Sequence, residues 1–143
     1  MTGTSDLERF VEAQNPVFEQ VRLELRGGRK SSHWMWFVFP QIKGLGHSPM
    51  AERFAISGGK EAEAYADHPI LGPRLNECTR LVNAIDGRSI SQIFGAPDDL
   101  KFRSSMTLFA KVSKDNEPFV HAIEKYFGGE FDSLTLDRLF IAR

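Results

Sequence analysis

Cysteine is nearly absent from this sequence, which contains only Cys78. No disulfide can form within one chain, and cysteine cannot supply a metal cluster. A reducing compartment is the environment that this composition fits best. The four histidines have no companion ligands at the spacing of a metal motif. We therefore expect neither a bound metal nor a cofactor.

Long apolar runs and an excess of one charge are also absent. No stretch approaches the roughly 20 apolar residues of a membrane span, and the N-terminus lacks the regions of a signal peptide. The sequence thus predicts a cytoplasmic protein with no membrane partner. Its 18 basic and 19 acidic residues give a net charge of −1, which argues against a nucleic-acid partner. A basic cluster is interpreted as a solvated helix end rather than a binding patch; it comprises Arg22, Arg26, Arg29 and Lys30.

Helical periodicity is the dominant pattern. Residues 1–143 suffice for one domain with its own core, and no repeat or linker divides them. Apolar residues recur at helical spacing between turn and cap signals, most regularly in residues 60–66, 70–85, 89–94, 118–127 and 134–141. The sequence predicts a compact all-α bundle of roughly six to eight short helices. Cys78 falls on the apolar stripe of residues 70–85, so we expect a buried, unreactive thiol.

The aromatic run, residues 33–41 with the sequence HWMWFVFPQ, is the most unusual segment and holds both tryptophans. Aromatic residues favour strands, but neither alternating face of the run is polar and no partner strands are evident. We therefore predict a short buried helix that is capped by Ser31 or Ser32 and ends before Pro40. Gly44, Gly46 and the residues between them are expected to form a loop at the rim of this segment.

Two interpretations of the aromatic run remain open. In one, the run anchors the core, because aromatic side chains bury large areas. In the other, it forms a pocket wall that stacks a base or a nicotinamide-like ring. The expected ligand-binding residues are then Trp34 and Trp36, with hydrogen bonds from His33 and Gln41.

Residues 98–105 contain the group of polar side chains that most resembles a functional site. Asp98, Lys101 and Ser105 share one face of a helix. Asp98 and Asp99 are the candidate catalytic residues, because an N-glycosidase needs a carboxylate to activate water or to stabilise an oxocarbenium-like transition state. The candidate substrate-binding residues are Lys101, Ser104 and Ser105. The alternative is that Asp98 or Asp99 caps the helix, Lys101 pairs with it, and Ser105 packs against a neighbouring helix.

Several blocks resemble a bacterial family of unknown function whose members are often mislabelled calpastatin. The two long blocks are SHWMWFVFPQ at residues 32–41 and KFRSSMTLF at residues 101–109, and the resemblance extends to residues 64–65, 68–69 and 93–95. It implies a compact all-α domain without an established activity. In helical character and size, the sequence also resembles the NADAR-type N-glycosidases more distantly. No catalytic or binding residue of that group can be assigned to a position in this sequence from this likeness.

Together these patterns predict that the protein binds a nucleotide- or nucleoside-like small molecule between residues 32–41 and 98–105. If it is an enzyme, the expected reaction is hydrolysis of an N-glycosidic bond. The alternative is a non-catalytic protein-interaction module in which the aromatic run is core. The sequence does not indicate an oligomeric state.

Overall fold

The computed structural model describes residues 6–141, and over this range the protein is all-α, as the sequence predicts. The range contains ten helices, more than expected, because several segments of four or five residues form helices of their own. The helices are α1 (Glu8–Gln14), α2 (Phe18–Arg26), α3 (Met35–Val38), α4 (Pro49–Arg53), α5 (Gly59–Asp67), α6 (Leu71–Asn83), α7 (Ile90–Phe94), α8 (Asp98–Val112), α9 (Glu117–Phe127) and α10 (Ser133–Ile141).

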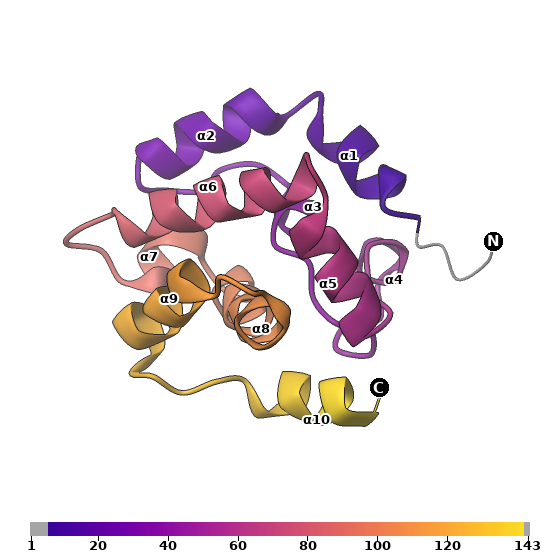
Figure 1. The fold of residues 1–143 in the computed structure, drawn as a ribbon. Coiled ribbons are helices and arrows are strands. Elements are labelled where there is room, and N and C mark those ends of the chain that lie inside the picture. The colour runs from indigo at the N-terminus through magenta and orange to yellow at the C-terminus, as the bar shows by residue number, and fades with distance from the viewer. Residues whose placement is uncertain (1–5, 142–143) are drawn as a thin grey trace.

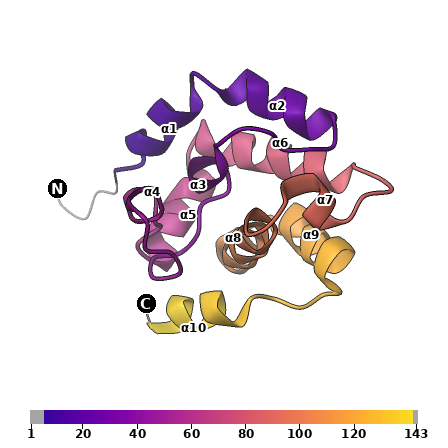
Figure 2. The same cartoon turned by 180° about the vertical axis from the view of Figure 1, so that it is seen from behind.

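Helix α8 lies at the centre of the bundle and organises the fold (Figure 1). It packs against α5, α7, α9 and α10, while α6 lies between α8 and the outer α2. Seen from behind, α7 lies beside α8 and α10 runs along the edge opposite α1 and α2 (Figure 2). Every residue from Ser104 to Ala110 is buried, so this part of α8 has no solvent-exposed face.

Local sequence signals account for several helix ends. The Ser48 hydroxyl accepts a hydrogen bond of 3.1 Å from the backbone N–H of Ala51, and Pro49 occupies the first helical position of α4. Ser89 and Gln92 form a capping box at the start of α7. At the end of α9, Gly128 adopts a left-handed conformation with φ 63°, which glycine reaches without steric cost.

Two other turn signals lie at the starts of helices. The Asn15-Pro16 pair comes just before α2, in which Val17 is the N-cap residue and Phe18 begins the helix. The pair Gly58-Gly59 opens α5, with Gly58 as the N-cap residue. Both pairs therefore mark breaks in the chain that precede a helix.

The core is one continuous cluster, and Cys78 on α6 is fully buried within it. Burial raises the pKa of the Cys78 thiol to about 12, with a smaller contribution from the nearby Glu77 carboxylate. The reactive thiolate is therefore scarce at neutral pH. We expect Ellman's reagent to label the native protein far more slowly than the urea-unfolded protein. Rapid labelling in native buffer would contradict the position given to Cys78.

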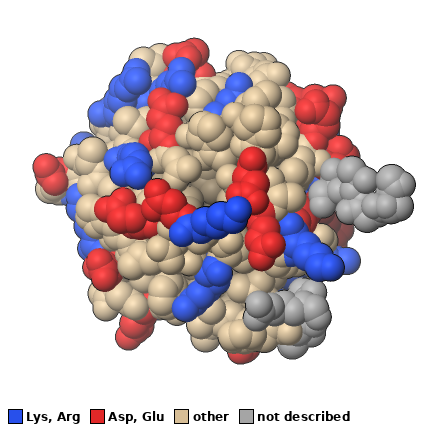
Figure 3. All heavy atoms as spheres, in the orientation of Figure 1, with Lys and Arg blue, Asp and Glu red and all other residues tan. Residues whose placement is uncertain are grey.

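The surface mixes both charges. On the face drawn in Figure 3, basic and acidic side chains are interspersed and neither covers a broad region. The sequence-adjacent basic cluster does not act as a unit, because Arg22 pairs with Glu77 at 2.7 Å and Lys30 pairs with Asp98 at 2.8 Å. None of the helices between residues 6 and 141 combines the length and apolarity that a membrane crossing requires.

Candidate functional site

The aromatic run forms the short helix α3, but its cap differs from the prediction. Trp34 is the N-cap residue, and no side chain caps the helix. The serines serve another purpose: the backbone N–H groups of Ser31 and Ser32 donate to the Glu24 carboxylate at 2.7 and 3.1 Å. Phe39 ends the helix immediately before Pro40, as expected.

Glu24 on α2 is a buried carboxylate surrounded by donors. It also accepts hydrogen bonds from the Ser32 hydroxyl, from Gln20 at 2.9 Å and from the Trp34 indole N–H at 2.9 Å. Burial acts to raise the pKa of Glu24, but the hydrogen bonds from Ser32, Ser31, Gln20 and Trp34 outweigh it and lower the pKa to about 2. Glu24 therefore stays ionised and fixes the segment that leads into α3.

The two tryptophans have different environments. Trp34 is only 1% exposed, and its ring packs against Phe39 and Phe94 in the core. Trp36 is half-buried and lines a surface hollow. His33, at the start of the run, is exposed and does not line this hollow. The core interpretation thus describes Trp34, and the pocket-wall interpretation describes Trp36.

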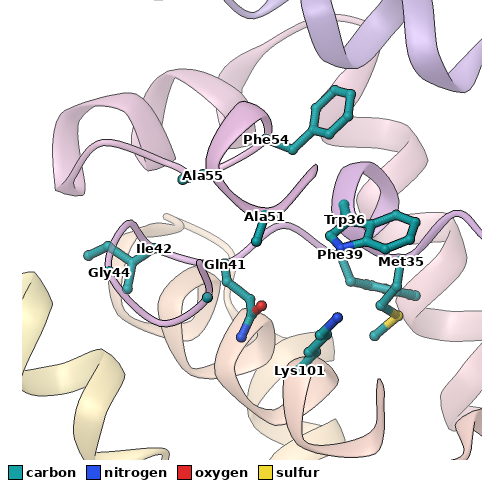
Figure 4. Close-up of a pocket in the computed structure, with 11 residues that line it drawn as sticks. Met35, Trp36, Phe39, Gln41, Ile42, Gly44, Ala51, Phe54, Ala55 and Lys101 are labelled. Atoms are coloured by element: carbon teal, nitrogen blue, oxygen red, sulfur yellow. The ribbon is translucent and has the colours of Figure 1, made fainter. Parts of the chain in front are cut away.

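The hollow lies between α3, α8 and the segment that connects α3 to α4 (Figure 4). It brings together Trp36, Gln41 and Lys101, three of the residues singled out from the sequence. The other lining residues are Met35, Phe39, Ile42, Gly44, Gly46, Ala51, Phe54 and Ala55. Its free volume is about 10 Å³, room for about one water molecule.

Lys101 is the one charged residue among those that line the hollow in the described part of the chain. Its ammonium nitrogen lies 5.3 Å from the centre of the Trp36 ring, within the range of a cation–π contact. It also lies 3.7 Å from one carboxylate oxygen of Asp98. The hollow therefore combines an aromatic wall, a side-chain amide and a cation.

Asp98 does not line the hollow. Its other carboxylate oxygen lies 2.8 Å from the ammonium nitrogen of Lys30, so the carboxylate joins two lysines. Asp98 is the first residue of α8, and the N-cap position is occupied by Pro97 without a side-chain cap. The alternative expectation that Asp98 caps α8 is therefore wrong, because its carboxylate is engaged by lysines.

The remaining predicted residues on α8 also lie away from the hollow. Asp99 accepts hydrogen bonds of 2.8 Å from the Ser91 hydroxyl and from the backbone N–H of Leu100. The Ser104 hydroxyl is 3.2 Å from the Asp132 carboxylate, whose oxygen also accepts from the Thr135 N–H at the start of α10. Ser105 is fully buried, and its hydroxyl has no partner among the described residues.

The outer wall of the hollow is a glycine-containing loop, as the sequence suggests. Within the described chain, residues 44–47 make no backbone hydrogen bonds, whereas Lys43 bonds to Ile56 at 2.7 Å just before them. Gly44 has φ 101°, and a Cβ there would lie 2.8 Å from the guanidinium carbon of Arg138 on α10. A Cβ on Gly46 would lie 2.9 Å from that of Ala51. At Gly44 the positive φ favours glycine, because the flexible Arg138 side chain could move aside, whereas at Gly46 the close approach of Ala51 favours it.

Comparison with known proteins supports the same family that the motifs suggest. Residues 4–139 match the family model described as "Protein of unknown function (DUF1810)", and the chain belongs to this family. A crystal structure of the conserved hypothetical protein Rv1873 from Mycobacterium tuberculosis is 58% identical in sequence. It matches with a TM-score of 0.93 over 94% of this chain and 96% of that chain. A search of curated proteins gives no match.

Proposed function

We propose that the protein binds a small molecule with a flat, nucleoside-like ring in the hollow between α3 and α8. One observation carries the proposal: Trp36 and Gln41 of the aromatic run converge on a single hollow with Lys101, which comes from the distant helix α8. The fold could have buried these side chains separately, as it buries Trp34. Their convergence supports a shared role at the surface.

Each of these groups suits a ring ligand. The half-buried indole of Trp36 offers an aromatic surface, and stacking of a base on such a surface contributes about 1–3 kcal/mol. The Gln41 amide can both donate and accept hydrogen bonds, which lets it recognise the polar edge of a heterocycle. The apolar neighbours Met35, Phe39 and Ile42 exclude water from the remaining sides.

The geometry supports binding more than N-glycosidic hydrolysis. Hydrolysis needs a carboxylate close to the scissile bond, and the described residues that line the hollow include no Asp or Glu. Asp98 is held by two lysines, and Asp99 bonds to Ser91 and to the backbone of Leu100. We therefore propose a binding protein and assign no catalytic role to either aspartate.

The rival interpretation, a protein-interaction module with an aromatic core, accounts for only part of the run. It explains the burial of Trp34 and Phe39. It gives no reason for the partial exposure of Trp36 beside Lys101 and Gln41. The small-molecule proposal accounts for both sets of residues.

A ligand screen tests the proposal. Nucleosides, nucleotides, ADP-ribose and flavin precursors should be added to the native protein, and a specific ligand should raise the melting temperature by mass action. In Trp36→Leu the affinity of that ligand, measured by calorimetry, should fall about tenfold or more, because stacking is lost. The control is His33→Ala in the same run, which should bind as tightly as the wild type. If no compound of the screen stabilises the protein, or if Trp36→Leu binds unchanged, the proposal is refuted.

A further inference from the structure

We infer that the ligand of this hollow carries an anionic group, which Lys101 binds, so that the site takes a nucleotide-like anion in preference to the neutral nucleoside. The inference rests on the proposed function and specifies that the proposed ligand is negatively charged. It follows from the ion cluster formed by Lys30, Asp98 and Lys101, hereafter the lysine–aspartate cluster.

The lysine–aspartate cluster retains a net positive charge. Two ammonium groups and one carboxylate leave one uncompensated positive charge at neutral pH. Asp98 lies 2.8 Å from Lys30 and 3.7 Å from Lys101, so the closer pairing is with Lys30. Lys30 is also the less exposed lysine, with a side-chain exposure of 9% against 26% for Lys101. The carboxylate therefore compensates mainly the inner lysine, and the surplus charge lies on Lys101.

Lys101 lines the hollow, and its surroundings there favour the binding of an anion. The described lining residues include no acid, and Gln41 and Lys101 are the two among them with polar side chains. An apolar wall lowers the local dielectric constant and strengthens the attraction of an anion. A ligand ring that lies along Trp36 would place its substituents within reach of the lysine 5.3 Å from the indole. A phosphate or carboxylate substituent would then replace the water that solvates the ammonium group.

Asp98 is assigned as a positioning residue by the same contacts. It binds Lys101 three residues further along α8 and joins it to Lys30 in the segment before α3. The Asp98 carboxylate therefore holds the Lys101 ammonium group in place and links α8 to the segment that precedes α3. Because Asp98 does not line the hollow, it acts on the ligand through Lys101.

Matched ligand pairs test the inference. The four common ribonucleosides and their 5′-monophosphates should be titrated calorimetrically into the wild type, with at least tenfold tighter binding expected for the monophosphate of a bound nucleoside. Lys101→Met should lower the affinity for the monophosphate at least tenfold more than the affinity for the nucleoside and so abolish this preference, and Lys101→Arg should restore it. Raising the salt concentration should weaken the preference in the wild type. The control is Lys111→Met on the same helix, whose ammonium group lies over Phe131 instead, and it should keep the preference.

The outcomes separate the two proposals. If no member of any pair binds, and the wider ligand screen also fails, the proposed function itself fails. If nucleosides and monophosphates bind the wild type equally, only the anion inference fails. Asp98→Asn should weaken the preference for the monophosphate without abolishing it, because Lys101 keeps its charge but loses the carboxylate that positions it. An unchanged preference in folded Asp98→Asn, with melting confirmed as cooperative, would overturn the positioning role of Asp98.

Discussion

Replacing Glu24 by glutamine is expected to lower the free energy of unfolding by about 2–4 kcal/mol. The carboxylate accepts hydrogen bonds from two backbone N–H groups, a hydroxyl, an amide and an indole, all of them near the start of α3 or on α2. Ser31, Ser32 and Trp34 donate their N–H groups to one carboxylate oxygen, whereas the Gln20 amide and the Ser32 hydroxyl donate to the other. Glutamine can keep the first oxygen, but it replaces the second acceptor by a donor and removes the negative charge that strengthens the whole set. Urea unfolding measures the loss. The control is Glu19→Gln on the same helix, whose side chain is 78% exposed and which should change stability little.

The dependence of stability on acidic pH should also show the contribution of the Glu24 carboxylate. The pKa of Glu24 is lowered to about 2 from an ordinary value of 4.5, so the folded state favours the ionised form. A lowered pKa contributes stability above the unfolded value and loses it as the pH falls toward the folded value. The stability from Glu24 is thus complete above about pH 5 and declines between pH 4.5 and 2. Glu24→Gln should show a shallower decline over this range, and an identical profile would refute the assignment.

Gly72→Ala is the second substitution with a large expected effect. Alanine normally favours a helix over glycine by about 1 kcal/mol. At this buried position in the first turn of α6, however, a Cβ would lie 2.3 Å from the carbonyl oxygen of Ala66. A backbone oxygen cannot move aside as a flexible side chain can, so α5 and α6 would have to separate. We expect a destabilisation of about 2 kcal/mol or more, measured by urea unfolding.

Gly59→Ala provides the matched comparison. Gly59 is also helical, and a Cβ there would lie 3.4 Å from a methyl carbon of Leu139, an ordinary contact. Its unfolding free energy should stay the same or rise by up to about 1 kcal/mol. If both variants behave alike, the close approach of α5 and α6 is not what selects glycine at Gly72.

The fold was largely predictable because its signals are local. The apolar stripe of α6, the Ser48-Pro49 start of α4 and the capping box of α7 involve residues within one or two turns of each other. The number of helices was underestimated, because helices of four or five residues contribute little periodicity. Pro16 and Gly58 each mark a break in the chain, but whether such a break ends one helix or begins the next depends on packing.

The candidate site was only partly predictable, for a geometric reason. Trp34 is the N-cap residue and Trp36 lies within α3, and the two side chains face different environments, one in the core and one at the surface. The sequence did not reveal which one faces outward, since that depends on Glu24, ten residues before Trp34, accepting the indole N–H. Likewise, Asp98 pairs with Lys30, which is distant from it in the sequence. Only the folded structure shows that the two residues meet.

The proximity of Arg138 to the loop at Gly44 has a kinetic consequence for the proposed ligand. A space that holds about one water molecule cannot admit a ring, so binding of the proposed ligand would require a rearranged form of the protein. Residues 44–47 are the wall least restrained by backbone hydrogen bonds, and the Arg138 guanidinium lies directly against them. Association would then wait for this wall to open, and its rate would level off at high ligand concentration. The measured affinity would be the intrinsic affinity reduced by the fraction of molecules that are open.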